Sequence, residues 1–291
     1  MTTPLKVAAV QMNSQQDVAA NLNTIKAATA QASEEGAKLI VLPENCYSMG
    51  NQSATAERFE ALSATLASYA SEYNVHLLVG SLPCPYRPDG SQIADGRLRQ
   101  TSQLFAPDGS RVARYDKIHL FTATVADKQG NYNEAATFEP GTQTVVAPIE
   151  VDNALYQLGM MVCFDLRFPA LAQRLRQAGA DILSAPSAFT YPTGQAHWSL
   201  LMRARAMDSQ CLVIGAAQGG THHYHDGQVR QTWGHSTITA FDGTVVDSYE
   251  SSEIKAEDKG KDYGLVFGHL DKSTQQSGRD KMPIFNSHRL A

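Results

Sequence analysis

Short apolar segments alternate with amphipathic ones along most of the chain. Each short apolar run is predicted to form a buried strand, at residues 7–11, 39–42, 76–80, 155–162, 182–185, 212–217, 237–241 and 264–269. Apolar residues spaced three and four apart predict amphipathic helices at residues 18–32, 59–73 and 198–208. Pro169 is expected in the first turn of a further helix, which Gly179 would end.

A hairpin is predicted in the first half of the chain. Residues 103–106 and 112–115 flank the turn sequence Pro107-Asp108-Gly109-Ser110, and a polar loop is expected over residues 122–144. Strands that alternate with helices, together with hairpins, indicate an α/β fold in which helices cover sheets. No linker, charge block or repeat interrupts the pattern, so residues 1–291 are predicted to form one domain.

Composition narrows the classes of function. The chain has 291 residues, of which 43% are hydrophobic and 18% charged, and a formal net charge of −5. Without a surplus of basic residues, binding to nucleic acid is not expected. No apolar stretch approaches the roughly 20 residues that span a bilayer, and the N-terminal segment does not resemble a secretory signal. We therefore expect a soluble, cytoplasmic protein that does not bind membranes.

The four cysteines are Cys46, Cys84, Cys163 and Cys211, and their spacing matches no zinc or redox motif. A disulfide framework is not expected at this low density, so each cysteine is judged by its surroundings. Cys163 ends the apolar run 155–162 and lies shortly before the helix that begins at Pro169. Such a junction offers backbone N–H groups and a positive helix end, which favour a thiolate and can hold an oxyanion. A buried, inert cysteine is the alternative.

Two further reactive groups follow predicted strands. Glu44 comes directly after the apolar run 39–42 and Pro43, where partial desolvation would make its carboxylate a better base near neutral pH. Lys117 and His119 alternate with Ile118, so on a strand both would point to one face, and a lysine there could stabilise a developing negative charge. A solvated glutamate and a solvated strand face are the alternatives. His119 is expected to be a supporting hydrogen-bonding residue.

The order Glu44, Lys117, Cys163 in these contexts resembles the nitrilase superfamily of carbon–nitrogen hydrolases. The resemblance begins at Val7-Ala8-Ala9-Val10-Gln11-Met12 and extends to Gly234-His235-Ser236. It implies a four-layer αββα sandwich, no metal and no organic cofactor, a Cys-thioester mechanism, and a homodimer or higher homo-oligomer. In that mechanism Glu44 is the general base, Cys163 the nucleophile, and Lys117 with the Phe164 N–H the oxyanion stabilisers.

The resemblance also implies a second glutamate, and Glu134, shortly before Pro140-Gly141, is the candidate to hold Lys117 or the leaving amine. The segment Ser187-Ala188-Phe189-Thr190, the run 193–198 and His222-His223 resemble the branch of deaminated glutathione amidases. The expected reaction is therefore cleavage of a small, anionic amide with release of ammonia. An ω-amidase, an N-carbamoyl amidase and a catalytically idle binding protein are the alternatives.

Substrate contacts are predicted for three residues near these motifs. Arg167 follows the nucleophile and is expected to pair with a substrate carboxylate, the alternative being a structural salt bridge with Asp165. Thr193 and His222 are further candidates to line the pocket. His222, His223 and His225 cluster as metal ligands can, but no carboxylate has suitable spacing around them, so a loop or substrate-adjacent role is expected.

Overall fold

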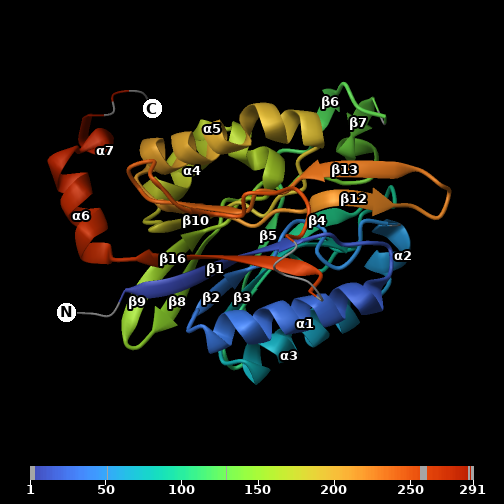
Figure 1. The fold of residues 1–291 in the computed structure, drawn as a ribbon, viewed down its shortest axis with the longest axis horizontal. Coiled ribbons are helices and arrows are strands. Elements are labelled where there is room, and N and C mark those ends of the chain that lie inside the picture. Colours follow the sequence, from blue (N-terminus) through green and yellow to red (C-terminus); the bar gives the residue numbers. More distant parts are fainter. Residues whose placement is uncertain (1–3, 51, 129, 256–260, 288, 290–291) are drawn as a thin grey trace.

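The computed structural model describes residues 4–50, 52–128, 130–255, 261–287 and 289, and its main feature is a pair of six-stranded sheets (Figure 1). The first sheet has the strand order β16-β1-β2-β3-β4-β5. Its strands are β1 (Leu5–Met12), β2 (Leu39–Val41), β3 (His76–Cys84), β4 (Arg99–Phe105), β5 (Arg111–Asp116) and β16 (Tyr263–Leu270). Strands β1, β2 and β3 run parallel, so their carboxyl ends meet at one edge of the sheet.

The second sheet has the order β15-β14-β11-β10-β9-β8. Its strands are β8 (Val146–Val151), β9 (Ala154–Gly159), β10 (Ile182–Ser184), β11 (Leu212–Gly215), β14 (Thr237–Thr239) and β15 (Val245–Ser248). Here β9, β10 and β11 are parallel. Two small hairpins stand apart from these sheets, β6 (Thr122–Thr124) with β7 (Asn131–Asn133), and β12 (Gly219–His223) with β13 (Val229–Trp233).

Helices cover the outer face of each sheet. Helices α1 (Val18–Glu34) and α3 (Phe59–Glu72) lie against the first sheet, and α4 (Pro169–Gln177) and α5 (Tyr191–Ser209) lie against the second (Figure 1). The remaining helices are α2 (Gln52–Ala56), α6 (Lys272–Lys281) and α7 (Ile284–Ser287). Asp17 caps α1, since its side chain accepts hydrogen bonds from the backbone N–H groups of Ala19 and Ala20. The predicted αββα layering is confirmed.

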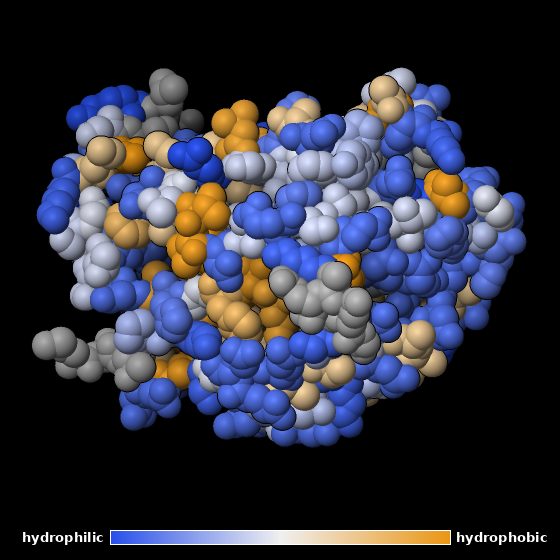
Figure 2. All heavy atoms as spheres, viewed as in Figure 1, coloured by the Kyte–Doolittle hydropathy of each residue, from blue (hydrophilic) through white to orange (hydrophobic). Residues whose placement is uncertain are grey.

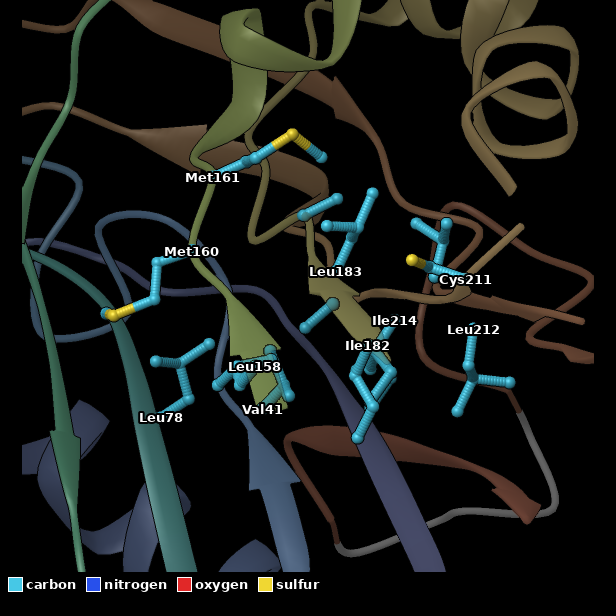
Figure 3. Close-up of a cluster of buried hydrophobic side chains, with 14 of the residues drawn as sticks. Val41, Leu78, Leu158, Met160, Met161, Ile182, Leu183, Cys211, Leu212 and Ile214 are labelled. Carbon is cyan, nitrogen blue, oxygen red and sulfur yellow. The ribbon is translucent and has the colours of Figure 1, made fainter. Parts of the chain in front are cut away.

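The two sheets bury their facing apolar side chains against each other. Val41 and Leu78 from the first sheet lie opposite Leu158 from the second, and all three are fully buried (Figure 3). Just beyond Leu158, Met160 turns toward Leu78 and Met161 turns to the other side of the strand (Figure 3). A second core fills the space between the first sheet and helices α1 and α3. The segment 160–162, which leads to Cys163, is therefore buried in the core between the two sheets.

Several elements differ from the sequence prediction. The predicted strand 155–162 ends at Gly159, and the predicted helix 198–208 begins at Tyr191. The predicted polar loop 122–144 contains the β6–β7 hairpin and one turn of 3₁₀ helix, η1 (Glu134–Ala136). The pattern did not predict β8, β12, β13, β15 or α6. Strands β12 and β13 are rich in polar and glycine residues, and α6 is strongly hydrophilic, so none carries a clear apolar period.

The surface is mainly hydrophilic on the face shown in Figure 2, with hydrophobic residues gathered near its middle. Large apolar side chains that are exposed include Leu155, Leu200, Met207, Val246 and Met282. In the described part of the chain, no helix is both long enough and apolar enough to cross a membrane. The homo-oligomer stays a prediction.

Candidate active site

Glu44, Lys117 and Cys163 come together where the strands of the two sheets end. Glu44 follows β2, Lys117 follows β5, and Cys163 opens the short 3₁₀ helix η2 (Cys163–Arg167) after β9. The Lys117 ammonium donates hydrogen bonds to Glu44 Oε1 and Glu134 Oε2, each at 2.8 Å. The side chain of Lys117 is 0% exposed and that of Glu44 is 3% exposed. The two alternatives for these residues, a solvated Glu44 and a solvated strand face at Lys117, are therefore wrong.

The position of Glu44 depends on a close approach of neighbouring backbones. A Cβ added to Gly80 would lie 2.2 Å from the carbonyl oxygen of Pro43, so a side chain at this place in β3 would push the Glu44 segment away. Beyond Glu44 the backbone turns sharply, because Asn45 has a φ of 53° in the left-handed region. The Asn45 N–H donates to Ser81 Oγ at 3.0 Å. The carboxylate is thus held on a fixed turn.

Lys117 lies outside the regular strands, which corrects the prediction that it and His119 share a strand face, because β5 ends at Asp116. Burial alone would lower the pKa of Lys117, but the charges of Glu134 and Glu44 outweigh it and raise that pKa well above its ordinary value. Glu134 itself accepts the Phe121 N–H at 2.7 Å. Burial and Glu44 raise the pKa of Glu134, although Lys117 opposes the shift. Lys117 is therefore a buried cation between two carboxylates.

Cys163 adopts a backbone conformation that is unfavourable for a residue with a side chain. Its φ is 50°, and its N–H donates to the Pro186 carbonyl at 2.8 Å. Burial and the charge of Glu44 raise the pKa of the Cys163 thiol well above its ordinary value, against the opposing effect of Lys117. The expectation that a helix end favours the thiolate is therefore wrong. The following helix η2 has only five residues, too few for a strong dipole to offset burial.

Asp165 connects the turn at Cys163 to the Lys117 segment, a role that the sequence pattern did not indicate. Its fully buried carboxylate accepts hydrogen bonds from the Tyr115 hydroxyl at 2.7 Å and from the backbone N–H of Val162 at 2.9 Å. It also accepts the His119 N–H at 3.0 Å and lies 2.7 Å from His119 Nδ1. In the described part of the chain Asp165 makes no ion pair with Arg167. The proposed structural salt bridge is thus not formed.

A pocket opens onto these groups and includes two of the three predicted substrate-binding residues. Glu44, Cys163, Arg167 and Thr193 line it, together with the rings of three phenylalanines, Phe121, Phe164 and Phe189. The guanidinium carbon of Arg167 lies 5.4 Å from the centre of the Phe189 ring, and one guanidinium nitrogen is 3.1 Å from the His197 ring. Phe164 stands in the first turn of η2, where a backbone N–H has no acceptor within its own helix.

Arg230 also lines this pocket, and the sequence did not indicate it. It lies on β13 and donates to the Ala188 carbonyl at 2.8 Å, while its buried Nε has no hydrogen-bond partner. The guanidinium also borders a second cavity of about 330 Å³, lined by residues of the β6–β7 and β12–β13 hairpins. These hairpins lie at the same end of the molecule (Figure 1).

His222 lies away from the pocket, which corrects its prediction as a lining residue. Its ring is fully buried, with Nδ1 2.7 Å from the Ser14 carbonyl and Nε2 2.7 Å from Thr232 Oγ1. Burial lowers the pKa of His222 to about 4, so the ring is neutral near pH 7. Nδ1 thus links the β12–β13 hairpin to the segment that follows β1, and Nε2 links β12 to β13. Among the described residues, no group of three histidine, cysteine or acidic side chains is arranged to hold a metal ion.

Comparisons with known proteins identify the family of this chain. The family model for carbon–nitrogen hydrolases matches residues 6–274. The deaminated glutathione amidase of Yersinia enterocolitica is 37% identical over 263 residues, which are 87% of each chain. That of Synechocystis is 33% identical over 292 residues, covering 99% of this chain and 98% of its own.

Solved structures show the same fold. The Caenorhabditis elegans NitFhit protein superposes with a TM-score of 0.82 at 31% identity, over 99% of this chain and 65% of that longer one. Saccharomyces cerevisiae Nit3, of the nitrilase superfamily, superposes with a TM-score of 0.74 at 26% identity, over 98% of this chain and 96% of its own. The chain belongs to the carbon–nitrogen hydrolase family of the nitrilase superfamily and is a hydrolase that acts on carbon–nitrogen bonds other than peptide bonds.

Proposed function

We propose that the protein is a thiol amidase that cleaves deaminated glutathione through a thioester on Cys163. One observation carries the chemical part of this proposal. A buried ammonium, Lys117, and two carboxylates, Glu44 and Glu134, surround a buried thiol at the base of a pocket. Because the pKa of that thiol is raised, the nucleophile needs a base at the moment of attack, and Glu44 is the base.

In the first half of the reaction, Glu44 takes the proton from Cys163 Sγ as the sulfur attacks the amide carbon. The carbonyl oxygen becomes an oxyanion, which the Lys117 ammonium and the Phe164 N–H stabilise. Glu44 then gives its proton to the amide nitrogen, the carbon–nitrogen bond breaks, and the amine leaves. The acyl group stays on the sulfur as a thioester.

In the second half, Glu44 takes a proton from a water molecule as the water oxygen attacks the thioester carbon. A second oxyanion forms at the same place and collapses, the carbon–sulfur bond breaks, and the sulfur recovers its proton from Glu44. The carboxylic acid product then leaves. Glu134 stays ionised against Lys117 throughout and keeps the ammonium aimed at the oxyanion.

The acyl part of the substrate carries a carboxylate, and Arg167 is the group that binds it. Its guanidinium is half-buried among Phe164 and Phe189, and burial lowers its pKa, which reflects lost hydration. A poorly hydrated guanidinium gains from a planar, two-pronged contact with a carboxylate. Thr193 lines the same pocket, with its hydroxyl 2.8 Å from that of Thr190, and is a further polar group that the substrate can contact there.

The choice of substrate rests on the names of the relatives. Deaminated glutathione and the ω-amidase substrate α-ketoglutaramate share a 2-oxoglutaryl group and differ in the amine that leaves. The first would release cysteinylglycine, and only the second has a primary amide that releases ammonia. The ammonia release expected from the sequence therefore does not apply to deaminated glutathione.

A direct comparison tests the proposal. Purified protein is given each compound, and kcat/KM is measured from the common product, 2-oxoglutarate. A higher value for deaminated glutathione is expected, because binding of the longer amine can be used in the transition state. An equal or reversed preference would contradict the substrate assignment. Intact-protein mass spectrometry after rapid acid quench should show the acyl group on Cys163, and its absence from a Cys163→Ala variant is the control.

A further inference from the structure

The catalytic pocket offers little free space, about 20 Å³. The neighbouring cavity of about 330 Å³ is far larger. Thr190 lines the pocket and Tyr191 the cavity, while Glu134 lines the pocket and Tyr132 the cavity. The outer cavity therefore offers space for the part of a substrate that lies beyond an amide at Cys163.

The outer cavity presents positive charge at the point where it meets the pocket. Arg230 lines both spaces, and Lys128 lines the outer one. The acid in this cavity, Asp127, already accepts the Tyr132 hydroxyl at 2.7 Å and the Gly130 N–H at 2.9 Å. Arg230 is held by the Ala188 carbonyl and by the ring of Tyr132, 5.5 Å away. These contacts hold the guanidinium where the two spaces meet, and a guanidinium forms strong, charge-assisted hydrogen bonds with a carboxylate.

We propose that Arg230 binds a carboxylate on the departing amine, so that the enzyme selects secondary amides whose amine part ends in a carboxylate. This inference rests on the proposed function and extends it from the acyl side of the scissile bond to the amine side. Arg167 holds the acyl carboxylate, and Arg230, with Lys128 farther out, holds the amine carboxylate. The two arginines then fix the amide from both ends across Cys163.

Three amides of the same 2-oxoglutaryl group test this. Their amine parts are cysteinylglycine, which ends in a carboxylate, cysteinylglycinamide, which does not, and ammonia. In the Arg230→Met variant, kcat/KM for the cysteinylglycine substrate should fall by about tenfold or more, the loss expected for a charge-assisted hydrogen bond. The values for the other two substrates should fall by less, so that the preference for the cysteinylglycine substrate over the cysteinylglycinamide substrate drops by about tenfold. Arg111→Met, the same change at an exposed position of β5, is the control and should alter none of them.

Two results would overturn the proposal. An equal fall for all three substrates would mean that Arg230 acts on the catalytic centre, since the Ala188 backbone that it holds also contacts the Cys163 sulfur. No fall for any substrate would mean that it does not contact the amine part. If Arg230→Met fails to fold, Arg230→Lys replaces it, with a smaller loss expected for the same substrate because lysine lacks the planar fork.

Product inhibition of the unchanged protein separates this inference from the substrate assignment. Cysteinylglycine should inhibit hydrolysis of α-ketoglutaramate at a lower concentration than cysteinylglycinamide does. Equal inhibition by the two would contradict the carboxylate site. If deaminated glutathione is not cleaved but cysteinylglycine still inhibits more strongly, the substrate assignment fails and the carboxylate site stands.

Discussion

Replacing Lys117 by Met would remove a buried ammonium group while keeping a side chain of similar length. The wild-type ammonium lies 2.8 Å from Glu44 Oε1 and 2.8 Å from Glu134 Oε2. At an effective dielectric constant of about 20, each such pair attracts by roughly 6 kcal/mol before the cost of desolvation. Removing one partner from a buried ion pair commonly costs about 3–5 kcal/mol of stability. The loss of an oxyanion donor lowers kcat by about 10²–10³-fold.

The stability loss in this variant should depend on pH. Two buried carboxylates without a cation cannot both stay ionised, so Glu134, whose pKa is already raised, would take up a proton. A carboxyl group with a raised pKa in the folded state stabilises the fold at low pH and loses that contribution as pH rises through the folded-state value. The free energy of unfolding of Lys117→Met should therefore fall further below that of the wild type at pH 8 than at pH 5.

Urea unfolding at both pH values and steady-state kinetics measure these effects. Lys26→Met is the matched control, since Lys26 pairs with Glu72 at 3.0 Å on the surface with side chains 43% and 46% exposed. It should change neither turnover nor the pH dependence of stability. A Lys117→Met protein that unfolds cooperatively and keeps more than about a tenth of wild-type kcat would refute the role of Lys117 in holding the oxyanion.

Three further outcomes are expected. The Cys163→Ser variant should lose turnover and stay folded. The control variant Cys84→Ser, at a buried cysteine outside the site, should stay active. Near-native turnover of Cys163→Ser would exclude the thioester route. Because the pKa of the Cys163 thiol is raised, its alkylation by iodoacetamide should still accelerate above pH 9, and a plateau below pH 7 would indicate a preformed thiolate. The Asp165→Asn variant should lower the free energy of unfolding by about 1–3 kcal/mol. It should also reduce kcat more than it changes KM. A changed KM with a normal kcat would argue against a role of Asp165 in positioning the segments that carry Cys163 and Lys117.

The sequence predicted the parts of the site that depend on local pattern. Glu44 stands out because an apolar run and a proline precede it, and Cys163 because it lies between a strand-like run and a helix start. The burial of Lys117 could not be predicted in this way. It depends on Glu44, 73 positions away, and Glu134, 17 positions away, which offset the cost of burying a charge. Glu134 was found only through the resemblance to the family.

Long-range contacts also explain the residues that the sequence did not reveal. Asp165 was considered only as a salt-bridge partner of Arg167, because its partners Tyr115 and His119 lie 50 and 46 positions earlier. His222 was placed wrongly in the pocket, since its hydrogen bond to Ser14 spans 208 positions. The predicted lowering of the Cys163 pKa was also wrong, because the groups that shift this pKa come near Cys163 only in the folded chain. A strand–helix junction suggests a thiolate, but burial and Glu44 decide the outcome.

The residues around Cys163 and the residues of the two small hairpins differ in which parts of a substrate they can recognise. In the proposed mechanism Glu44, Lys117 and Cys163 act on atoms that every amide possesses, so they cannot tell one amine part from another. The groups that can do so lie on the β6–β7 and β12–β13 hairpins, which the hydrophobic pattern did not reveal, and Arg230 is the one that reaches the pocket. A chain could keep the two packed sheets and the catalytic centre unchanged while these two hairpins changed the substrate. Among proteins with this fold, substrate preference should therefore vary with the residue at position 230 and with the other residues that line the outer cavity. It should vary less closely with overall sequence identity.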